Sequence, residues 1–505
     1  MKKNLLLILL ILLIFLIFMF PKSIYAATSW DEFVVELSND ENIINIENNI
    51  SGNSNITISK DKTINLNGFN ISSKIITIDN AEVNINNGKI TSTASNTLSI
   101  VNGGVVNLNN STIENTKNGG YSVYIKGTST DDGIKTKLKI DSDSIVSANF
   151  ALGIQKNENA SYGVVLDVYG SIIGENTINT YNYGGVGIHV MNYIKSNNGN
   201  VPEINIYDGA NIIAKQGNSG DVNADDAPAI YAEGYARFNI TGGIIKGSEA
   251  ITAFSSEFNI SGGELIGMGD FHEVQLESNK SVATGSAIAL IENSSFPGKI
   301  SLNISSANIT SEKSSAIRSL ISASALDSSI SSINLSGGRY IGKDDSLKML
   351  AYNKFVSGGC YNNVIEDSFL LSDDLSIVEN DNYYCVGIKR QVSTNEDSNK
   401  FVDVDVKDAI AGQKVKILAK KVSGYKVSNL IVTTASGKTV EVIDGTFVMP
   451  DEEVVIEVEY IIEEIPNPET LDNIHLSFVV FIASFIVLVL LCCFYNISVK
   501  KINEV

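Results

Sequence analysis

The stretch N-I-T-G-G-I-I, residues 239–245, is one of ten copies of a seven-residue phrase that recurs from about residue 65 to residue 340. Each copy has a polar residue, an apolar residue, two small or polar residues, a Gly or other small residue, any residue, and an apolar residue. The copies begin at Asn65, Asn84, Asn107, Lys139, Asp167, Asn205, Asn239, Asn259, Asn303 and Asn334.

The phrase predicts a strand with one inward-pointing apolar residue, a tight bend, and a second strand that begins with another inward residue. Gly and Asn suit the bend because both tolerate positive φ at little cost. A single copy cannot bury its apolar face, so we expect the copies to stack on one another.

The starts of the copies are separated by 19 to 44 residues. A parallel β-helix accommodates such variation, because its turns absorb insertions while its strands stay in register. We therefore predict an all-β chain in which residues 51–345 form a parallel β-helix. The alternative is a series of antiparallel β-sandwich modules, which would need hairpin turns at regular short spacing.

The composition points to an exported, soluble ectodomain. The chain has 505 residues and a formal net charge of −20, and it is poor in Pro and Trp. No basic stripe is present to neutralise phosphates, so a nucleic-acid partner is not expected.

The first 26 residues have the features of a secretory signal peptide. Lys2 and Lys3 precede the apolar run of residues 5–20, and S-I-Y-A-A follows Pro21. Cleavage is predicted after Ala26, with Ala27 as the alternative site. An uncleaved membrane anchor is the other interpretation, because the apolar run is long.

The mature chain opens with T-S-W-D-E-F-V-V-E-L, residues 28–37. Thr28 or Ser29 can cap a helix, and Trp30, Phe33, Val34 and Leu37 recur at helical spacing. We expect residues 27–50 to form this capping helix and a first strand, which cover the open end of the stack. With D-K-T-I-N-L-N-G-F-N-I (residues 61–71), this opening resembles right-handed β-helix surface proteins of the pectate-lyase-like superfamily. The resemblance covers about residues 28–390.

Residues 346–392 are predicted to close the β-helix. The segments F-V-S-G-G-C-Y (355–361) and V-E-N-D-N-Y-Y-C-V-G (378–387) resemble the end of such β-helices in related surface proteins. They contain Cys360 and Cys385, the two cysteines of the exported part. A disulfide between them and two free thiols both remain open at this point.

A linker at 393–400 precedes clean polar–apolar alternation over residues 401–460. Short strands with G-Y-K-V, A-S-G-K and D-G-T-F-V-M-P turns predict a small antiparallel β-sandwich. The order of these motifs is similar to the immunoglobulin-like repeats of bacterial surface proteins, which implies a stalk module.

The C-terminus is predicted to anchor the chain. Residues 461–475 form a linker, residues 476–494 are long and apolar enough to span a bilayer, and Lys500 and Lys501 lie in a predicted cytoplasmic tail, residues 495–505.

The order of motif, apolar helix and basic tail resembles a cell-wall sorting signal. Asn467, Pro468, Glu469 and Thr470 match its N-P-x-T form, which implies a sortase and peptidoglycan as partners. Leu471 departs from the usual Gly or Asn, and a plain membrane anchor is the alternative.

Long inserts between copies hold the candidate ligand loops, with Tyr181, Tyr183, Asp225 and Asp226 as the chosen residues. Aromatic rings beside carboxylates can bind sugars, whereas solvated loops are the plainer interpretation. A Ca²⁺ ion at D-V-N-A-D-D (221–226) is a weak prediction, and no other cofactor or metal site is expected.

No catalytic signature stands out in this sequence. His189 and His272 are isolated in sequence, and His475 borders the apolar segment. The hypothesis is therefore a surface-anchored adhesin that binds glycans or host or neighbouring surfaces. A polysaccharide lyase or glycoside hydrolase acting at Asp225 and Asp226 is the alternative, and a structural surface component is a third.

Overall fold

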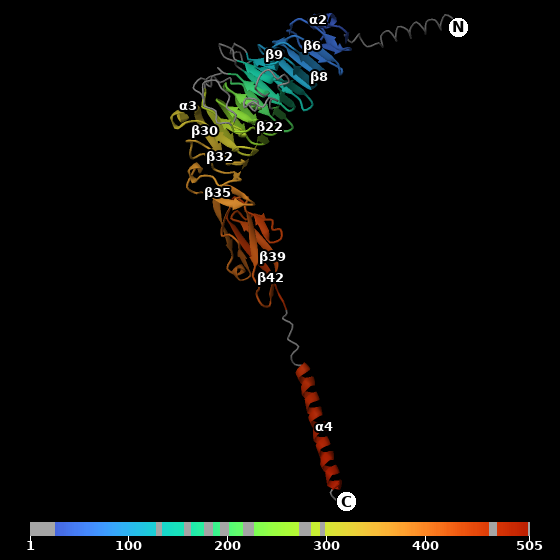
Figure 1. Cartoon of the computed structure of the whole chain (residues 1–505), viewed down its shortest axis with the longest axis vertical. Helices are drawn as coiled ribbons and strands as arrows, with labels where there is room; N and C mark the ends of the chain where they lie inside the picture. Colours follow the sequence, from blue (N-terminus) through green and yellow to red (C-terminus); the bar gives the residue numbers. More distant parts are fainter. Residues whose placement is uncertain are drawn as a thin grey trace, which may run out of the picture. The chain divides into compact units, whose positions relative to one another are not determined.

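The computed structural model describes residues 26–127, 134–155, 163–175, 185–191, 201–215, 227–271, 284–292, 298–463 and 472–502. It divides into two units, Met1–Lys389 and Arg390–Val505. The chain is mostly β, with long parallel sheets in the first unit and an apolar helix near the C-terminus (Figure 1).

Strands of the first unit fall into three columns, which the chain visits in turn. Within a column each strand pairs in parallel with the strand of the next turn of the chain. The first column contains β1 (Ala26–Ala27), β2 (Ile43–Ile46), β5 (Lys62–Asn65), β8 (Glu82–Ser92), β10 (Val105–Asn115), β12 (Thr136–Ile140), β15 (Val164–Val168), β18 (Glu203–Ile206), β21 (Arg237–Ile240), β24 (Ser256–Ile260), β27 (Ile300–Ile304) and β30 (Ile330–Leu335).

The second column begins with β3 and takes in the C-terminal halves of the long strands β8 and β10. Its strands besides β8 and β10 are β3 (Ile50–Ser51), β6 (Asn70–Ser73), β13 (Ile145–Ala148), β16 (Ser171–Gly174), β19 (Asn211–Ala214), β22 (Ile244–Gly247), β25 (Glu264–Gly267), β28 (Asn308–Ser311), β31 (Arg339–Ile341) and β33 (Cys360–Tyr361).

The third column is a separate sheet of 11 strands, here called sheet B. It contains β4 (Ile56–Ile58), β7 (Ile76–Asp79), β9 (Asn96–Val101), β11 (Tyr121–Lys126), β14 (Phe150–Gln155), β17 (Val186–Val190), β20 (Ile230–Ala232), β23 (Ile251–Ala253), β26 (Ile288–Leu290), β29 (Ile317–Ser319) and β32 (Leu347–Lys348).

The core of this unit lies between the columns and consists mainly of Ile, Leu and Val. Alternate strand residues point inward, so Ile212, Ile245 and Leu265 are fully buried at successive turns of the second column. Phe238 and Phe258 stack inside the first column with ring centroids 4.8 Å apart. The predicted bends use Gly as expected: Gly243 and Gly263 have φ of 83° and 91°.

The predicted copies lie in register from the second copy onward. Asn84, Asn107, Lys139, Asp167, Asn205, Asn239, Asn259, Asn303 and Asn334 occupy one continuous row of the first column. The predicted start of the first copy was wrong by two residues, because Thr63 pairs with Asn84 and Asn65 pairs with Asn86. A two-residue slip keeps every side chain on the same face, so alternation could not reveal it.

The predicted N-terminal helix is α2 (Trp30–Ser38), and Ser29 caps it by accepting a hydrogen bond from the backbone N–H of Glu32. Phe33 and Leu37 are buried, but Val34, placed on the same face in the prediction, is 37% exposed. Below the helix end, the buried Lys62 ammonium donates to the carbonyl oxygens of Glu36, Asn39 and Glu41 at 3.3, 2.7 and 2.6 Å. Those three bonds use all of its donors.

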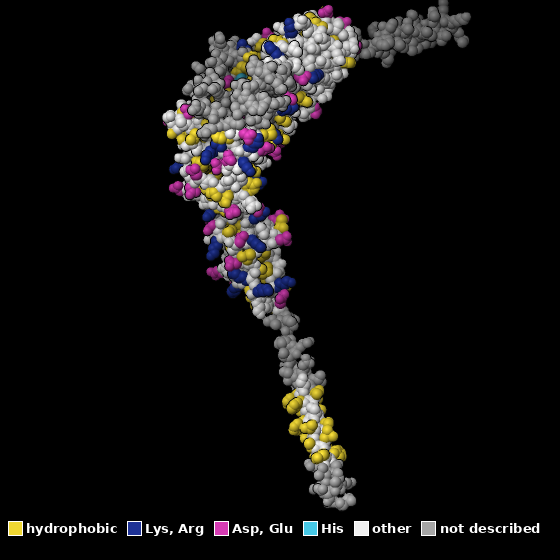
Figure 2. All heavy atoms as spheres, in the orientation of Figure 1, with side chains coloured by type: hydrophobic (Ala, Val, Ile, Leu, Met, Phe, Trp, Pro, Cys, Tyr) yellow, Lys and Arg dark blue, Asp and Glu magenta, His cyan; other side chains and the backbone are white. Residues whose placement is uncertain are grey.

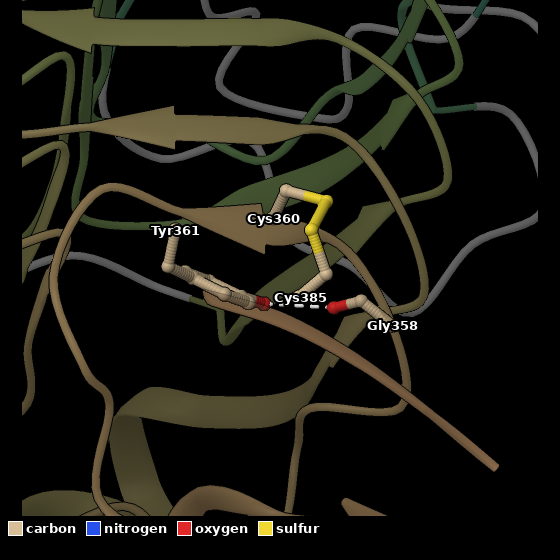
Figure 3. The surroundings of a disulfide bond; sticks show 4 residues. All are labelled: Gly358, Cys360, Tyr361 and Cys385. Atoms are coloured by element: carbon tan, nitrogen blue, oxygen red, sulfur yellow. Dashed lines mark hydrogen bonds between the residues drawn. A yellow bond between two sulfur atoms is a disulfide. The ribbon is translucent and has the colours of Figure 1, made fainter. Parts of the chain in front are cut away.

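Parallel pairing ends at β33, where the hairpin of β34 (Leu375–Asn380) and β35 (Tyr383–Thr394) pairs antiparallel. Cys360 and Cys385 face each other in this register and are joined by a disulfide (Figure 3). The neighbouring Tyr361 is fully buried, and its hydroxyl donates to the Gly358 carbonyl at 2.9 Å. Short helices at the end of this unit are η2 (Ala323–Ala325), α3 (Leu326–Ser329) and η3 (Asp367–Phe369).

The second unit has its own core around Val415, Val432 and Phe447. Its strands pair antiparallel, except that Val392–Thr394 of β35 run parallel to β42. Ser393 and Thr394, predicted as linker, therefore belong to a strand that buried Val392 ties to this core. The elements are η4 (Ser398–Lys400), β36 (Val402–Val404), β37 (Asp408–Ile410), β38 (Lys414–Ala419), β39 (Tyr425–Thr434), β40 (Thr439–Val440), β41 (Thr446–Val448) and β42 (Val454–Ile462).

The last element is α4 (Asp472–Ile502). Its segment Ser477–Tyr495 is long and apolar enough to cross a membrane. Figure 2 shows hydrophobic side chains along this part of the helix. The predicted span of residues 476–494 differs from it by one residue.

Candidate functional site

The outer face of sheet B is the candidate site, because the long connections of the first unit meet at its edges. Connections between the first and second columns contain at most four residues, as at 141–144. Apart from residues 28–42, which contain α2 and join β1 to β2, every connection longer than five residues between the described strands of the three columns enters or leaves sheet B, including 175–185, 215–229, 268–287 and 191–202. Loops that a rigid scaffold holds around one face are where binding residues concentrate.

An aromatic strip covers the middle of this face. It consists of Tyr121, Tyr124, Phe150, His189, Tyr231 and Phe254, from strands β11, β14, β17, β20 and the end of β23. Consecutive ring centroids lie 5.2 to 5.8 Å apart. The register explains the arrangement, since Tyr124, Gly153, His189 and Tyr231 occupy one outward row.

At the centre of the strip, His189 lies between a phenol and a carboxylate. The Tyr121 hydroxyl is 3.0 Å from His189 Nδ1, and Glu233 Oε2 is 3.3 Å from Nε2. Burial raises the pKa of the Tyr121 phenol well above its ordinary value. A phenol that donates a hydrogen bond to Nδ1 places the ring proton on Nε2, from which it reaches Glu233.

The same outward row continues through Thr252 and Ala289 to Arg318. Arg318 is 9% exposed. Its guanidinium carbon lies 4.3 Å from the centroid of the Phe271 ring, and Nη2 donates to the hydroxyls of Ser314 and Ser315 at 3.2 and 3.3 Å. Its ion pair with Asp344 is long, with 3.9 Å between Nη2 and Oδ2.

Two buried polar atoms in this row have no hydrogen-bond partner among the described residues. They are Arg318 Nε and Thr252 Oγ1, two strands apart with the small Ala289 between them. Burial lowers the pKa of Arg318, but a guanidinium remains cationic in proteins. An incompletely paired cation at this depth favours an acidic group as its partner.

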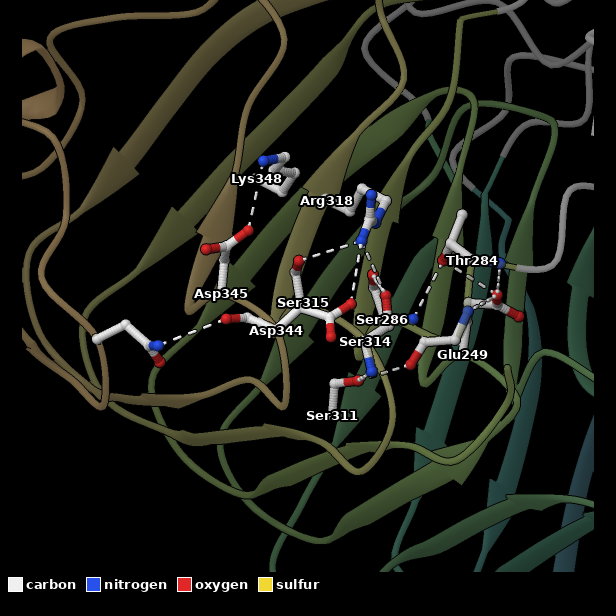
Figure 4. A network of polar contacts seen from close by, with 12 residues as sticks. Glu249, Thr284, Ser286, Ser311, Ser314, Ser315, Arg318, Asp344, Asp345 and Lys348 are labelled. Carbon is white, nitrogen blue, oxygen red and sulfur yellow. Dashed lines mark hydrogen bonds and ion pairs between the residues drawn. The ribbon is translucent and has the colours of Figure 1, made fainter. Parts of the chain in front are cut away.

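A hydroxyl network joins this arginine to a buried carboxylate (Figure 4). The Thr284 hydroxyl donates to Glu249 Oε1 at 3.0 Å and accepts from the Ser286 backbone, whose hydroxyl lies 3.3 Å from that of Ser314. Glu249 also accepts from Ser248 and from the Thr284 and Gly285 backbone N–H groups. Burial raises the pKa of Glu249, although these hydrogen bonds act to lower it.

A second polar surface lies on the outer side of the first column. It follows the row from Asn84 to Asn334 described above, here called the asparagine row. Asn239, Asn259, Asn303 and Asn334 line a shallow groove of about 370 Å³ together with Thr241, Ser261, Ser305 and Ser336. The asparagine amides bond to one another along the row, as Asn303 does to Asn259 at 3.1 Å. Because Asn239, Asn259 and Asn303 already bond to one another, this groove is the weaker candidate.

The residues chosen from the sequence fall mostly outside the described part of the chain. This holds for Tyr181, Tyr183, Asp225 and Asp226, for the 221–226 calcium segment, and for the sorting motif Asn467–Thr470. Cys360 and Cys385 are described and are bonded to each other. Within the described residues, no group of three His, Cys, Asp or Glu side chains could hold a metal ion.

The sequence argument missed the aromatic strip and treated His189 as isolated. Its partners Tyr121 and Glu233 are 68 and 44 residues away in the chain. Aligning each turn on its inward Ile or Val would have placed Tyr124, His189 and Tyr231 in one row.

No family model, no curated protein and no solved structure matches this chain.

Proposed function

We propose that this chain is a surface-anchored binding protein whose first unit is a right-handed parallel β-helix with a glycan-binding face on sheet B. The second unit is an immunoglobulin-like stalk, and α4 holds the chain in the membrane before or instead of sortase attachment to peptidoglycan. The three-column parallel pairing supports the β-helix, and the length and apolarity of Ser477–Tyr495 support the anchor.

The observation that carries the binding function is the aromatic strip between the edges where the long connections meet. Aromatic rings cover the apolar faces of sugar rings, while neighbouring polar groups accept or donate hydrogen bonds to the hydroxyls. Glu233 and His189 supply such groups on the strip itself. Arg318, on the same row, favours a glycan that carries a carboxylate or another acidic group.

The test is a titration of the purified segment 27–466 against neutral and uronic-acid-containing polysaccharides. Tyr124→Ala and Tyr231→Ala should each weaken binding at least tenfold, because each removes one ring of the strip. Arg318→Met should weaken binding of the acidic glycans alone. The control is Tyr207→Ala, which breaks the Tyr169–Tyr207 stack on a bend outside sheet B. Equal losses for all four variants, or retention by none of the polysaccharides, would refute the proposal.

A second candidate function is cleavage of the bound polysaccharide by a lyase or hydrolase mechanism. The Tyr121–His189–Glu233 arrangement favours it, because a carboxylate orients an imidazole that contacts a phenol. The raised pKa of Tyr121 opposes it, since the phenolate that would act as the base is scarcely populated at neutral pH. Shortened chains that disappear with His189→Gln and with Tyr121→Phe would establish this candidate in place of binding alone.

A further inference from the structure

One end of the second unit carries exposed apolar side chains that its own core does not cover. Along β42 the alternation Val454, Ile456 and Val458 inward, with Glu457 and Glu459 outward, stops at Tyr460. From there Tyr460, Ile461 and Ile462 are 47%, 52% and 75% exposed, and Tyr425 on the neighbouring strand is 40% exposed. We call these four residues the Tyr–Ile patch; Tyr425, Tyr460 and Ile462 lie on one face at the end of the sheet, and Ile461 lies on the other.

The patch is preorganised by aromatic packing. Phe401 stacks on Tyr460 with ring centroids 4.3 Å apart, and Tyr425 meets Tyr460 edge-on at 5.4 Å. Tyr425 pairs with Ile462 across the two strands, and Lys426 pairs with Ile461. A cluster held this way presents its apolar surface at little further cost in side-chain entropy.

Lysines lie near the patch in the sequence. Lys421 and Lys426 are exposed, and Lys420 lies 3.6 Å from Asp403. Acidic residues also border the patch in the chain, with Glu459 before Tyr460 and Glu463 and Glu464 after Ile462. Tyrosine with lysine is the composition that proteins place at the polar interface of a bilayer, where the ring spans the boundary and the ammonium reaches anionic headgroups.

The chain itself ties this patch to the apolar helix. Eight residues, 464–471, separate Glu463 from Asp472 at the start of α4. Whatever path they take, eight residues extend over at most about 30 Å. A short tether holds the patch at a high effective concentration near the bilayer, so a weak interfacial affinity is sufficient.

From these observations we infer that the Tyr–Ile patch docks on the outer surface of the membrane that α4 spans, with Lys421 and Lys426 on anionic lipid headgroups. The inference rests on the anchor in the proposed function. Its consequence is that the second unit stands on the membrane as a fixed base for the first unit.

The test uses the full chain in lipid nanodiscs, with Cys492→Ser and Cys493→Ser so that a new cysteine can be labelled alone. An environment-sensitive fluorophore is placed at Ile462→Cys, and at Val448→Cys as the control. Val448 is 55% exposed and pairs with Lys414 at the start of β38. The strand β36, which follows Phe401, pairs with the other end of β38. Discs of phosphatidylcholine, with or without phosphatidylglycerol, carry a nitroxide quencher on the lipid headgroup.

We expect blue-shifted emission and at least twofold quenching at position 462, stronger with phosphatidylglycerol, and neither at position 448. Lys421→Glu with Lys426→Glu should abolish the phosphatidylglycerol effect. A probe at 462 that stays in water in loaded discs overturns the docking alone, whereas a chain that does not co-purify with discs overturns the anchor and the docking together. A shift that requires two chains per disc identifies a second copy as the partner and also overturns the inference.

Discussion

At the scale of single residues, Glu249 ties the stability of the first unit to pH. Its carboxyl is fully buried, and burial raises its pKa above the ordinary value near 4.5. Below that value the acid is protonated in both the folded and the unfolded chain. As pH rises, the unfolded chain loses the proton first, so the free energy of unfolding should fall until the folded carboxyl also ionises.

Glu249→Gln should remove this dependence, because glutamine resembles the protonated acid and can still accept at Oε1. We expect urea unfolding of wild type and variant to agree near pH 4.5 and the variant to be the more stable at pH 7. Glu264→Gln, on an exposed position of β25, controls for the loss of a charge. A wild-type chain that gains stability relative to the variant as pH rises would contradict a raised pKa for Glu249.

Single residues were also the hardest to place from the sequence. Helical spacing put Val34 with Phe33 and Leu37, but spacing carries no information on how wide a surface α2 covers, and Val34 is left at its edge. Lys62 gave no signal as a buried residue, because the three carbonyls that hold it belong to the end of α2 and the turn beyond. His189 likewise depends on contacts between different turns of the chain.

At the scale of elements, the asparagine row holds successive strands of the first column together. The amide of each residue donates to the preceding one, from Asn303 through Asn259, Asn239 and Asn205 to Asp167, over 2.9 to 3.4 Å. Asn239→Ala removes one donated and one accepted bond and should lower the free energy of unfolding by about 1–2 kcal/mol.

The matched control for this row is Asn308→Ala, at an exposed strand position of β28. It should change the free energy of unfolding by less than about 0.5 kcal/mol. Chemical denaturation of the first unit measures both variants, and equal effects would mean that the row contributes nothing beyond strand propensity.

Element order was accessible to sequence reasoning because one requirement recurs at every turn. Most turns have a short polar side chain in the row, Ile or Leu next to it in the core, and Gly or Asn at the bend, and the nine copies from Asn84 onward align in register. The first turn has Thr63 in this row and an Asn two residues later at Asn65, which led to the two-residue slip. Where inserts replace the phrase, as before β17 and β20, no such requirement guides the assignment.

The Cys360–Cys385 disulfide closes the last parallel strand onto the antiparallel hairpin. It links residues 25 apart. A cross-link over a loop of that length stabilises by about 3–4 kcal/mol through the entropy of the unfolded chain. Cys360→Ala with Cys385→Ala should therefore lower the thermal midpoint of the first unit, and reduction of wild type should have the same effect. Reduction of the Cys492→Ser, Cys493→Ser chain tests that the response comes from this pair, and an unchanged midpoint would contradict it.

At the scale of the whole molecule, the proposed function assigns recognition to the first unit and attachment to the second. From β3 to β32 the long connections border sheet B, so insertions there leave the connections between the other two columns short. The second unit carries short turns and no comparable inserts within its described residues. Sequence reasoning found the boundary between the units from the change in alternation after residue 400. It could not locate the outer face of sheet B, because the sequence does not show which column of strands the long connections border.

Linkage to the cell wall and anchoring in the membrane can be distinguished by substituting Thr470. If a sortase reads Asn467–Thr470, it cuts after Thr470, and the chain becomes linked to the wall without α4. Muramidase should then release the mature chain, boiling detergent should not, and antibody to residues 496–505 should fail to detect it.

Thr470→Ala should keep the tail and move the chain to the detergent-soluble membrane fraction, while Thr446→Ala, in the short strand β41, should leave attachment unchanged. Wild type that dissolves in detergent with its tail intact would instead make α4 the permanent anchor, because a segment of this length and apolarity is sufficient to hold the chain in a bilayer.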